Sequence, residues 1–78
     1  MEIKMFYRTQ RDVAVAINQL VDAYWKEKII EQKLIESIKD IHKNNQKKLL
    51  KDNEFTKVVQ QQCGKRRLVI VERILEMK

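Results

Sequence analysis

The chain has 78 residues, a formal net charge of +6, no proline, one glycine, one cysteine and one histidine. A single cysteine excludes an internal disulfide, and together with a single histidine it excludes a closed zinc site. The lack of turn residues disfavours an all-β fold, whereas the abundant Lys, Glu, Gln, Leu and Ile favour helix.

We expect one helical domain over residues 1–78, because this length suits a single small core. No apolar run approaches the ~20 residues needed to span a bilayer, so no membrane partner is expected. The free thiol and the absence of a signal peptide favour a reducing, cytoplasmic location. A core this small is marginally stable, which makes a homodimer one expectation.

The N-terminal residues 2–7 alternate in polarity, with Ile3, Met5 and Tyr7 on one side. This alternation is a weak strand signal. Because one strand alone is not stable, we expect an extended arm over residues 1–8 that pairs with another part of the molecule.

The first helix is predicted over about residues 10–27. Thr9 precedes it and Asp12 follows three residues later, in an arrangement that resembles a capping box. Apolar residues then recur at helical spacing. They are Val13, Ile17, Leu20 and Tyr24, with Ala16, Val21 and Trp25 widening the stripe.

The apolar phase slips over residues 26–29, which predicts a turn before a second helix from about Ile30. The residues expected to face inward are Leu34, Ile38 and Ile41. This helix ends at Asn44 or continues to Lys51, and the adjacent asparagines 44–45 are its natural fraying point.

A third helix is predicted after Asp52 or Asn53, either of which can serve as its N-cap. Phe55, Val59 and Cys63 form its apolar stripe at a spacing of four. After Gly64 the stripe resumes; residues 68–71 also fit a short buried strand, but residues 72–76 favour helix. The fold expected is therefore an all-α bundle of three or four helices with an extended N-terminal arm.

The most informative segment is residues 63–67, where Gly64 is followed by Lys65, Arg66 and Arg67. If a helix begins near Lys65, its free N–H groups and the three cations would converge on one anion. The segment is not a Walker loop, which needs an upstream glycine and a following Ser or Thr. A simple helix break with surface cations fits the pattern equally well.

A second basic feature is a lysine ridge, which consists of Lys39, Lys43, Lys47 and Lys51. On a helix these side chains drift slowly round the face opposite the inward residues, where they could follow a phosphate backbone. The more ordinary interpretation is a solvated helix face, because most charge runs are solvated.

Other chemistry-bearing residues have ordinary explanations. Cys63 lies on an apolar stripe and is expected to be buried rather than reactive. Tyr24 and Trp25 could stack on bases, but packing beside the core is the preferred interpretation. His42 has no ligand set around it, and we find no catalytic constellation. We therefore expect no enzyme activity, no cofactor and no metal.

Several segments together resemble short, uncharacterised proteins of low-GC Gram-positive bacteria and of their phages or plasmids. These segments are residues 9–12, 17–21, 24–25, 55–59 and 61–68. The most distinctive is the Gln-Gln-Cys-Gly-Lys-Arg-Arg-Leu block that ends at Leu68. The resemblance implies a bacterial, mobile-element-linked origin and carries over no functional residue.

Two functions are weighed on this basis. The first is a non-enzymatic nucleic-acid-binding or regulatory protein, in which residues 64–67 grip phosphate with support from the lysine ridge. The second is a protein-interaction module that docks on an acidic surface of a host or phage enzyme. A nucleic-acid binder should place both basic features on one continuous face, whereas a protein binder should show an exposed apolar patch rimmed by charge.

Overall fold

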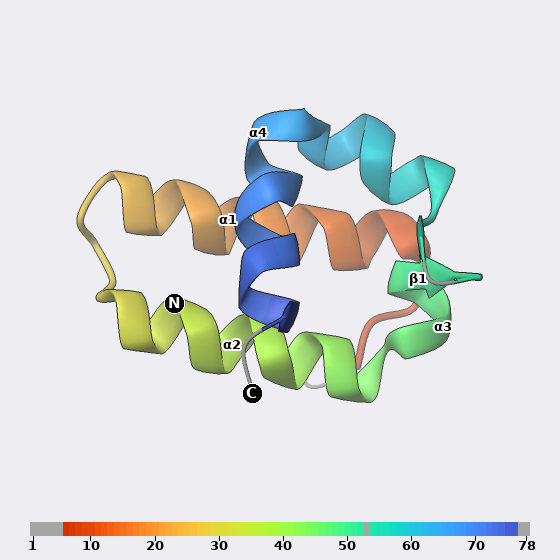
Figure 1. Cartoon of the computed structure of the whole chain (residues 1–78), viewed down its shortest axis with the longest axis horizontal. Helices are drawn as coiled ribbons and strands as arrows, with labels where there is room; N and C mark the ends of the chain where they lie inside the picture. Colours follow the sequence, from red (N-terminus) through yellow and green to blue (C-terminus); the bar gives the residue numbers. More distant parts are fainter. Residues whose placement is uncertain (1–5, 53, 77–78) are drawn as a thin grey trace.

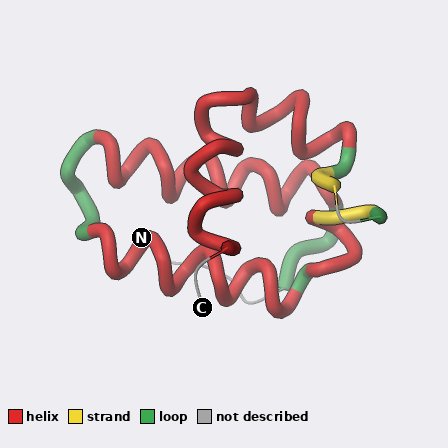
Figure 2. The backbone as a smooth tube through the Cα atoms, viewed as in Figure 1, coloured by secondary structure: helices red, strands yellow, loops and turns green. Residues whose placement is uncertain are grey.

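Four helices and one short hairpin follow one another in the computed structural model, which describes residues 6–52 and 54–76 (Figure 1). The elements are α1 (Gln10–Trp25), α2 (Glu31–Asn44), α3 (Gln46–Leu49), β1 (Leu50–Lys51), β2 (Glu54–Phe55) and α4 (Lys57–Glu76). Helix accounts for most of the described chain (Figure 2). The predicted all-α bundle is therefore confirmed.

Helix α1 begins where its cap predicts. The Thr9 side-chain oxygen accepts a hydrogen bond from the Asp12 backbone N–H at 3.0 Å, which satisfies one of the free donors of the first turn. The expected stripe is buried from Val13 to Val21, with Val13, Ile17 and Val21 fully inaccessible to solvent, whereas Tyr24 is half-buried and Trp25 is exposed.

Helix α1 ends at Trp25, two residues before the predicted boundary, in a cap that uses no glycine. The Lys28 N–H donates to the Ala23 carbonyl at 2.8 Å, and the Glu27 N–H donates to the Tyr24 carbonyl at 3.0 Å. This pair of bonds is a Schellman motif, which needs a left-handed residue after the last turn. Glu27 supplies that residue with φ 60°, a conformation in which side chains other than glycine are strained.

Helix α2 stops at Asn44, which is the shorter of the two predicted alternatives, and buried Asn45 explains the end. The Asn45 amide nitrogen donates to the Ile41 carbonyl at 3.0 Å, and its amide oxygen accepts from the Tyr7 N–H at 3.0 Å. Lys48 Nζ also donates to the Tyr7 carbonyl. The N-terminal arm is thus tied to the end of α2 at Tyr7. Of the strand signal predicted over residues 2–7, residues 2–5 lie outside the described residues, and residues 6 and 7 are not in a strand.

The prediction that Asp52 or Asn53 caps the third helix is wrong, because a hairpin stands there. Strands β1 and β2 pair antiparallel, with Leu50 opposite Phe55 and Lys51 opposite Glu54. Asp52 lies in the turn with φ 53°, which Asp tolerates better than most residues, and Asn53 lies outside the described residues. Thr56 begins α4 instead: its side-chain oxygen accepts from the Val59 N–H at 3.3 Å.

Helix α1 lies at the centre of the molecule (Figure 1). It packs against α2, α3 and α4, and α4 also packs against α2. The core they share includes Ile17, Leu20, Leu34, Ile38, Ile41, Leu49, Val59 and Val71, each at most 1% exposed. Among the described residues, no helix is long and apolar enough to cross a membrane.

The strained cap of α1 gives a stability test. Glu27→Gly should raise the free energy of unfolding by roughly 0.5–1 kcal/mol, because glycine relieves the left-handed strain and loses only part of that gain to unfolded-state entropy. Urea denaturation followed by circular dichroism measures the change. Lys28→Gly is the matched control; it should lower stability, since Lys28 has no positive φ. Equal effects of the two substitutions would contradict the strained cap.

Candidate functional site

The predicted anion site at residues 64–67 coincides with a sharp bend of α4. Gly64 has φ 77° and ψ 164°, so the helix consists of a first limb, residues 57–63, and a second limb, residues 65–76. This region of backbone space is essentially accessible to glycine alone. The two limbs point in different directions, and the second crosses in front of α1 and α2 (Figure 1).

The bend is held by three hydrogen bonds, two of which satisfy carbonyls that it frees. The Asn18 amide donates to the Gln62 carbonyl at 2.9 Å, and the Cys63 thiol donates to the Ala14 carbonyl at 3.6 Å. From the second limb, Arg67 Nη1 donates to the Cys63 carbonyl at 3.2 Å. The distinctive Gln-Cys-Gly-Lys-Arg-Arg sequence therefore builds a joint between α1 and both limbs of α4.

Arg67 also forms an ion pair with Asp22 on α1. Its Nε donates to Asp22 Oδ1 at 3.0 Å, and its Nη2 donates to Oδ2 at 3.1 Å, which is a two-pronged arrangement. This hydrogen bonding to Asp22 raises the pKa of the Arg67 guanidinium further above its usual range. Of the three predicted anion ligands, Arg67 is thus paired within the chain, while Lys65 and Arg66 are exposed.

Trp25 lies against the same cations. Its ring centroid is 5.7 Å from Arg66 Cζ and 5.9 Å from Arg67 Cζ, within the range of cation–π attraction. Packing explains Tyr24, which contacts the core, but Trp25 is 44% exposed and belongs to the surface. The structure therefore pairs an exposed tryptophan with an exposed arginine, which periodicity alone did not indicate.

The lysine ridge does not form one helical face. Lys39 and Lys43 lie on α2, Lys47 on α3 and Lys51 on β1, because α2 ends at Asn44. The end of α2 lies beside the residues that precede α1. The Gly64 joint instead contacts α1 at Ala14, Asn18 and Asp22. The two basic features therefore lie on different elements, and the lysine ridge is divided among three of them.

Two exposed apolar residues lie where α1 connects to α2. Ile30 is 71% exposed in this connection, and Trp25 precedes it. Beside them is a hollow of about 280 Å³, lined by Tyr24, Glu31, Leu34, Ile35, Ile70, Arg73 and Ile74. Arg66, Ile70 and Arg73 recur at helical spacing, so they share one face of the second limb. We call the surface formed by Trp25, Ile30, Ile35, Arg66, Ile70 and Arg73 the Trp25 face.

Sequence reasoning missed this surface for an identifiable reason. It assigned Trp25 to packing beside the core stripe and treated Ile30 as the start of a helix. The available signal was the placement of both apolar residues beside a cluster of charged residues at a predicted turn, residues 26–29.

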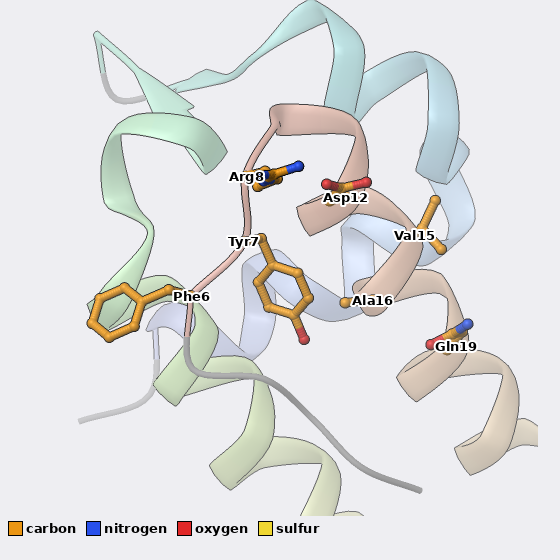
Figure 3. A pocket seen from close by; sticks show the side chains of 7 residues that line it. All are labelled: Phe6, Tyr7, Arg8, Asp12, Val15, Ala16 and Gln19. Carbon is orange, nitrogen blue, oxygen red and sulfur yellow. The ribbon is translucent and has the colours of Figure 1, made fainter.

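A further hollow, of about 420 Å³, lies at the start of α1 (Figure 3). Its lining residues are Phe6, Tyr7, Arg8, Asp12, Val15, Ala16 and Gln19. The Tyr7 ring lies in the middle of this group, whereas Phe6 projects away from the others. Its charged lining residues are Arg8 and Asp12. Within the described residues, no group of three or more His, Cys, Asp or Glu residues could hold a metal ion.

Comparison with protein-family models places this chain in a wider group. A model described as a conserved hypothetical protein matches residues 4–76. The chain belongs to this family. The matched range contains all four helices, the hairpin and the Gly64 joint. No curated protein matches the chain, and no solved structure does. The family description names no activity, so the proposal of function depends on the surfaces.

The Gly64 joint gives a second stability test. Gly64→Ala should lower the free energy of unfolding by about 1–3 kcal/mol, because alanine strongly disfavours this backbone conformation. The effect is conformational, since a Cβ at Gly64 would meet nothing within 4 Å. Urea denaturation measures it, with Lys65→Ala at the neighbouring exposed position as control. A Gly64→Ala protein as stable as that control would refute the required bend.

Cys63 is buried, at 2% exposure, as its place on the stripe predicts. Burial raises the pKa of its thiol from 9.0 to about 11, and the nearby charge of Arg67 opposes this shift in part. The joint therefore holds a neutral thiol at neutral pH.

This shift predicts how stability depends on pH. Between pH 9 and 11 the unfolded chain loses the Cys63 proton while the folded chain keeps it, so stability should fall as pH rises. Wild type should lose more stability over this range than Cys63→Ala, which lacks the thiol. Urea denaturation at several pH values measures the difference.

A thiol reagent should also react slowly with the native protein and quickly in denaturant. Parallel pH curves and equal reaction rates would place the thiol at the surface.

Proposed function

We propose that this chain is a non-enzymatic, cytoplasmic interaction module that docks on an acidic protein surface through its Trp25 face. The exposed Trp25 ring, with Arg66 and Arg67 against it and with exposed Ile30 in the connection that follows, carries the proposal. The partner would be an enzyme of the bacterial host or of a phage, whose activity the docking modulates. This setting is taken from the resemblance to short proteins of bacteria and their mobile elements.

The chemistry of the Trp25 face suits such a contact. Tryptophan and arginine are the residue types that most often dominate binding energy at protein interfaces. The hollow beside Ile35 and Ile70 can receive an apolar side chain of the partner. Arg66 and Arg73 would meet carboxylates at the rim, and the net charge of +6 would speed the encounter with an acidic surface.

Nucleic-acid binding is the second candidate, supported by the exposed Lys65 and Arg66 beside Trp25. An exposed tryptophan can stack on a base, and the lysine ridge can add phosphate contacts. The division of the lysine ridge among α2, α3 and β1 favours the protein partner, because the ridge does not offer a nucleic acid one continuous helical face.

The two candidates are separated by affinity purification of the tagged protein from its native cells, with and without nuclease treatment. A specific protein should be retained by wild type after nuclease and lost with Trp25→Ala. The matched control is Val15→Ala, an exposed apolar residue elsewhere on α1, which should keep the partner. Both variants should remain folded, with a free energy of unfolding within about 0.5 kcal/mol of wild type, as is usual for surface substitutions. Urea denaturation verifies this.

A salt titration against generic DNA and RNA tests the second candidate directly. If Lys65 and Arg66 contact phosphates, replacing both with glutamine should lower the slope of log affinity against log salt by about 1–2. Arg67 is left unchanged because its loss would open the Asp22 ion pair. Retention of a partner only without nuclease, together with this slope change, would replace the protein-partner proposal with nucleic-acid binding.

A further inference from the structure

A groove lined by apolar and acidic side chains lies on a different face of the second limb of α4 from the Trp25 face. Two hollows of about 500 and 450 Å³ adjoin there, since Phe55, Gln60 and Glu72 line both. The apolar lining residues are Leu50, Phe55, Leu68, Val69 and Leu75. The groove thus runs between the hairpin and the second limb, which are both visible in Figure 1.

The charge of this groove is unlike that of the rest of the chain. Its acidic members are Glu54, Glu72 and Glu76, while Lys65 is the only cation among the described residues that line it. Within the described residues none of these three carboxylates forms an ion pair, and all three are exposed. In a chain of net charge +6, an apolar groove bordered by three unpaired carboxylates is a local exception. We call this surface the acidic groove.

The spacing along the second limb shows what shape of partner fits. Leu68, Glu72 and Leu75 recur at intervals of four and three residues, and Glu76 follows Glu72 by four. These residues share one face of the helix, so apolar and acidic side chains alternate along the groove. Val69 adds an apolar side chain that is 39% exposed at its border.

We propose that the acidic groove binds a positively charged amphipathic helix of a partner protein. The apolar side of that helix packs on Phe55, Val69 and Leu75, and its lysines or arginines pair with Glu72 and Glu76. Recognition by an amphipathic helix in an apolar groove is a recurring mode, in which residues three and four apart provide the anchors. The carboxylates select for cations and repel nucleic acid.

A second copy of this chain does not meet these requirements. Its lysine ridge has the right charge, but the apolar residues of α2 are buried in its own core, with Leu34, Ile38 and Ile41 each 1% exposed. The acidic groove also lies on a different helical face from Arg66, Ile70 and Arg73. Its occupancy therefore does not depend on the function proposed for the Trp25 face.

The test is fluorescence anisotropy of the full chain with a short helical amphipathic peptide built from leucine and lysine. Because the chain as a whole is basic, its net charge repels this peptide, so any attraction must come from the carboxylates of the acidic groove. Glu72→Lys with Glu76→Lys should weaken binding at least about tenfold, since two attractions become repulsions. The control, Glu36→Lys with Asp40→Lys, changes the net charge equally at exposed positions four apart on α2, and should change affinity less than about twofold.

Two further variants keep the test independent of folding and of the Trp25 face. Glu72→Gln with Glu76→Gln removes the charges with little change in shape and should weaken binding in the same direction. Trp25→Ala should bind the peptide as wild type does, even if it loses the acidic partner. Circular dichroism and urea denaturation verify that each variant is folded.

Several outcomes would overturn the proposal. Absence of peptide binding, equal binding of a leucine and glutamate peptide, or equal losses in the groove and control variants would each do so. Sedimentation of the free protein tests the alternative occupant. A wild-type dimer that the Glu72→Lys and Glu76→Lys changes dissociate would assign the acidic groove to a second copy instead.

Discussion

The bend at Gly64 is the constraint on which the rest of the structure depends. A chain without proline has few ways to break a long helix, and only glycine readily adopts φ 77° with ψ 164°. The bend lets the second limb cross α1 and α2, where Val71 and Ile74 complete the core. It also directs Arg67 back to Asp22, so one of the three cations in the most basic segment of the sequence is paired within the chain.

The same limb carries parts of both surfaces to which we assign binding. One face joins Arg66, Ile70 and Arg73 to Trp25, and another presents Glu72 and Glu76 beside apolar side chains. Although the net charge is +6, the second limb therefore carries cations on one face and carboxylates on another. If both proposals hold, the chain would join an acidic partner to a basic helix, which is a simple way for a small module to bring two proteins together.

The small size of the domain explains why its helix ends and turns are fixed by specific hydrogen bonds. A domain of this length has a small stability margin, and it places Glu27 and Asp52 in left-handed conformations without the help of glycine. Buried Asn45 and the Thr9 cap offset such strain by satisfying backbone groups at the helix ends. Ile30 and Trp25 nevertheless remain exposed, which is the cost that a partner covering the Trp25 face would remove.

The sequence by itself determined the helical class, the Thr9 cap, the inward stripes of α1 and α2, and the burial of Cys63, because periodicity and capping are local properties. Only the tertiary structure decided the hairpin at Asp52, the partner of Arg67 and the exposure of Trp25. Each of these depends on which segments meet in space. Asp52 fits a helix cap and a turn equally well by composition, and the basic segment after Gly64 gives no sign that Asp22, 45 residues earlier, will neutralise one of its charges.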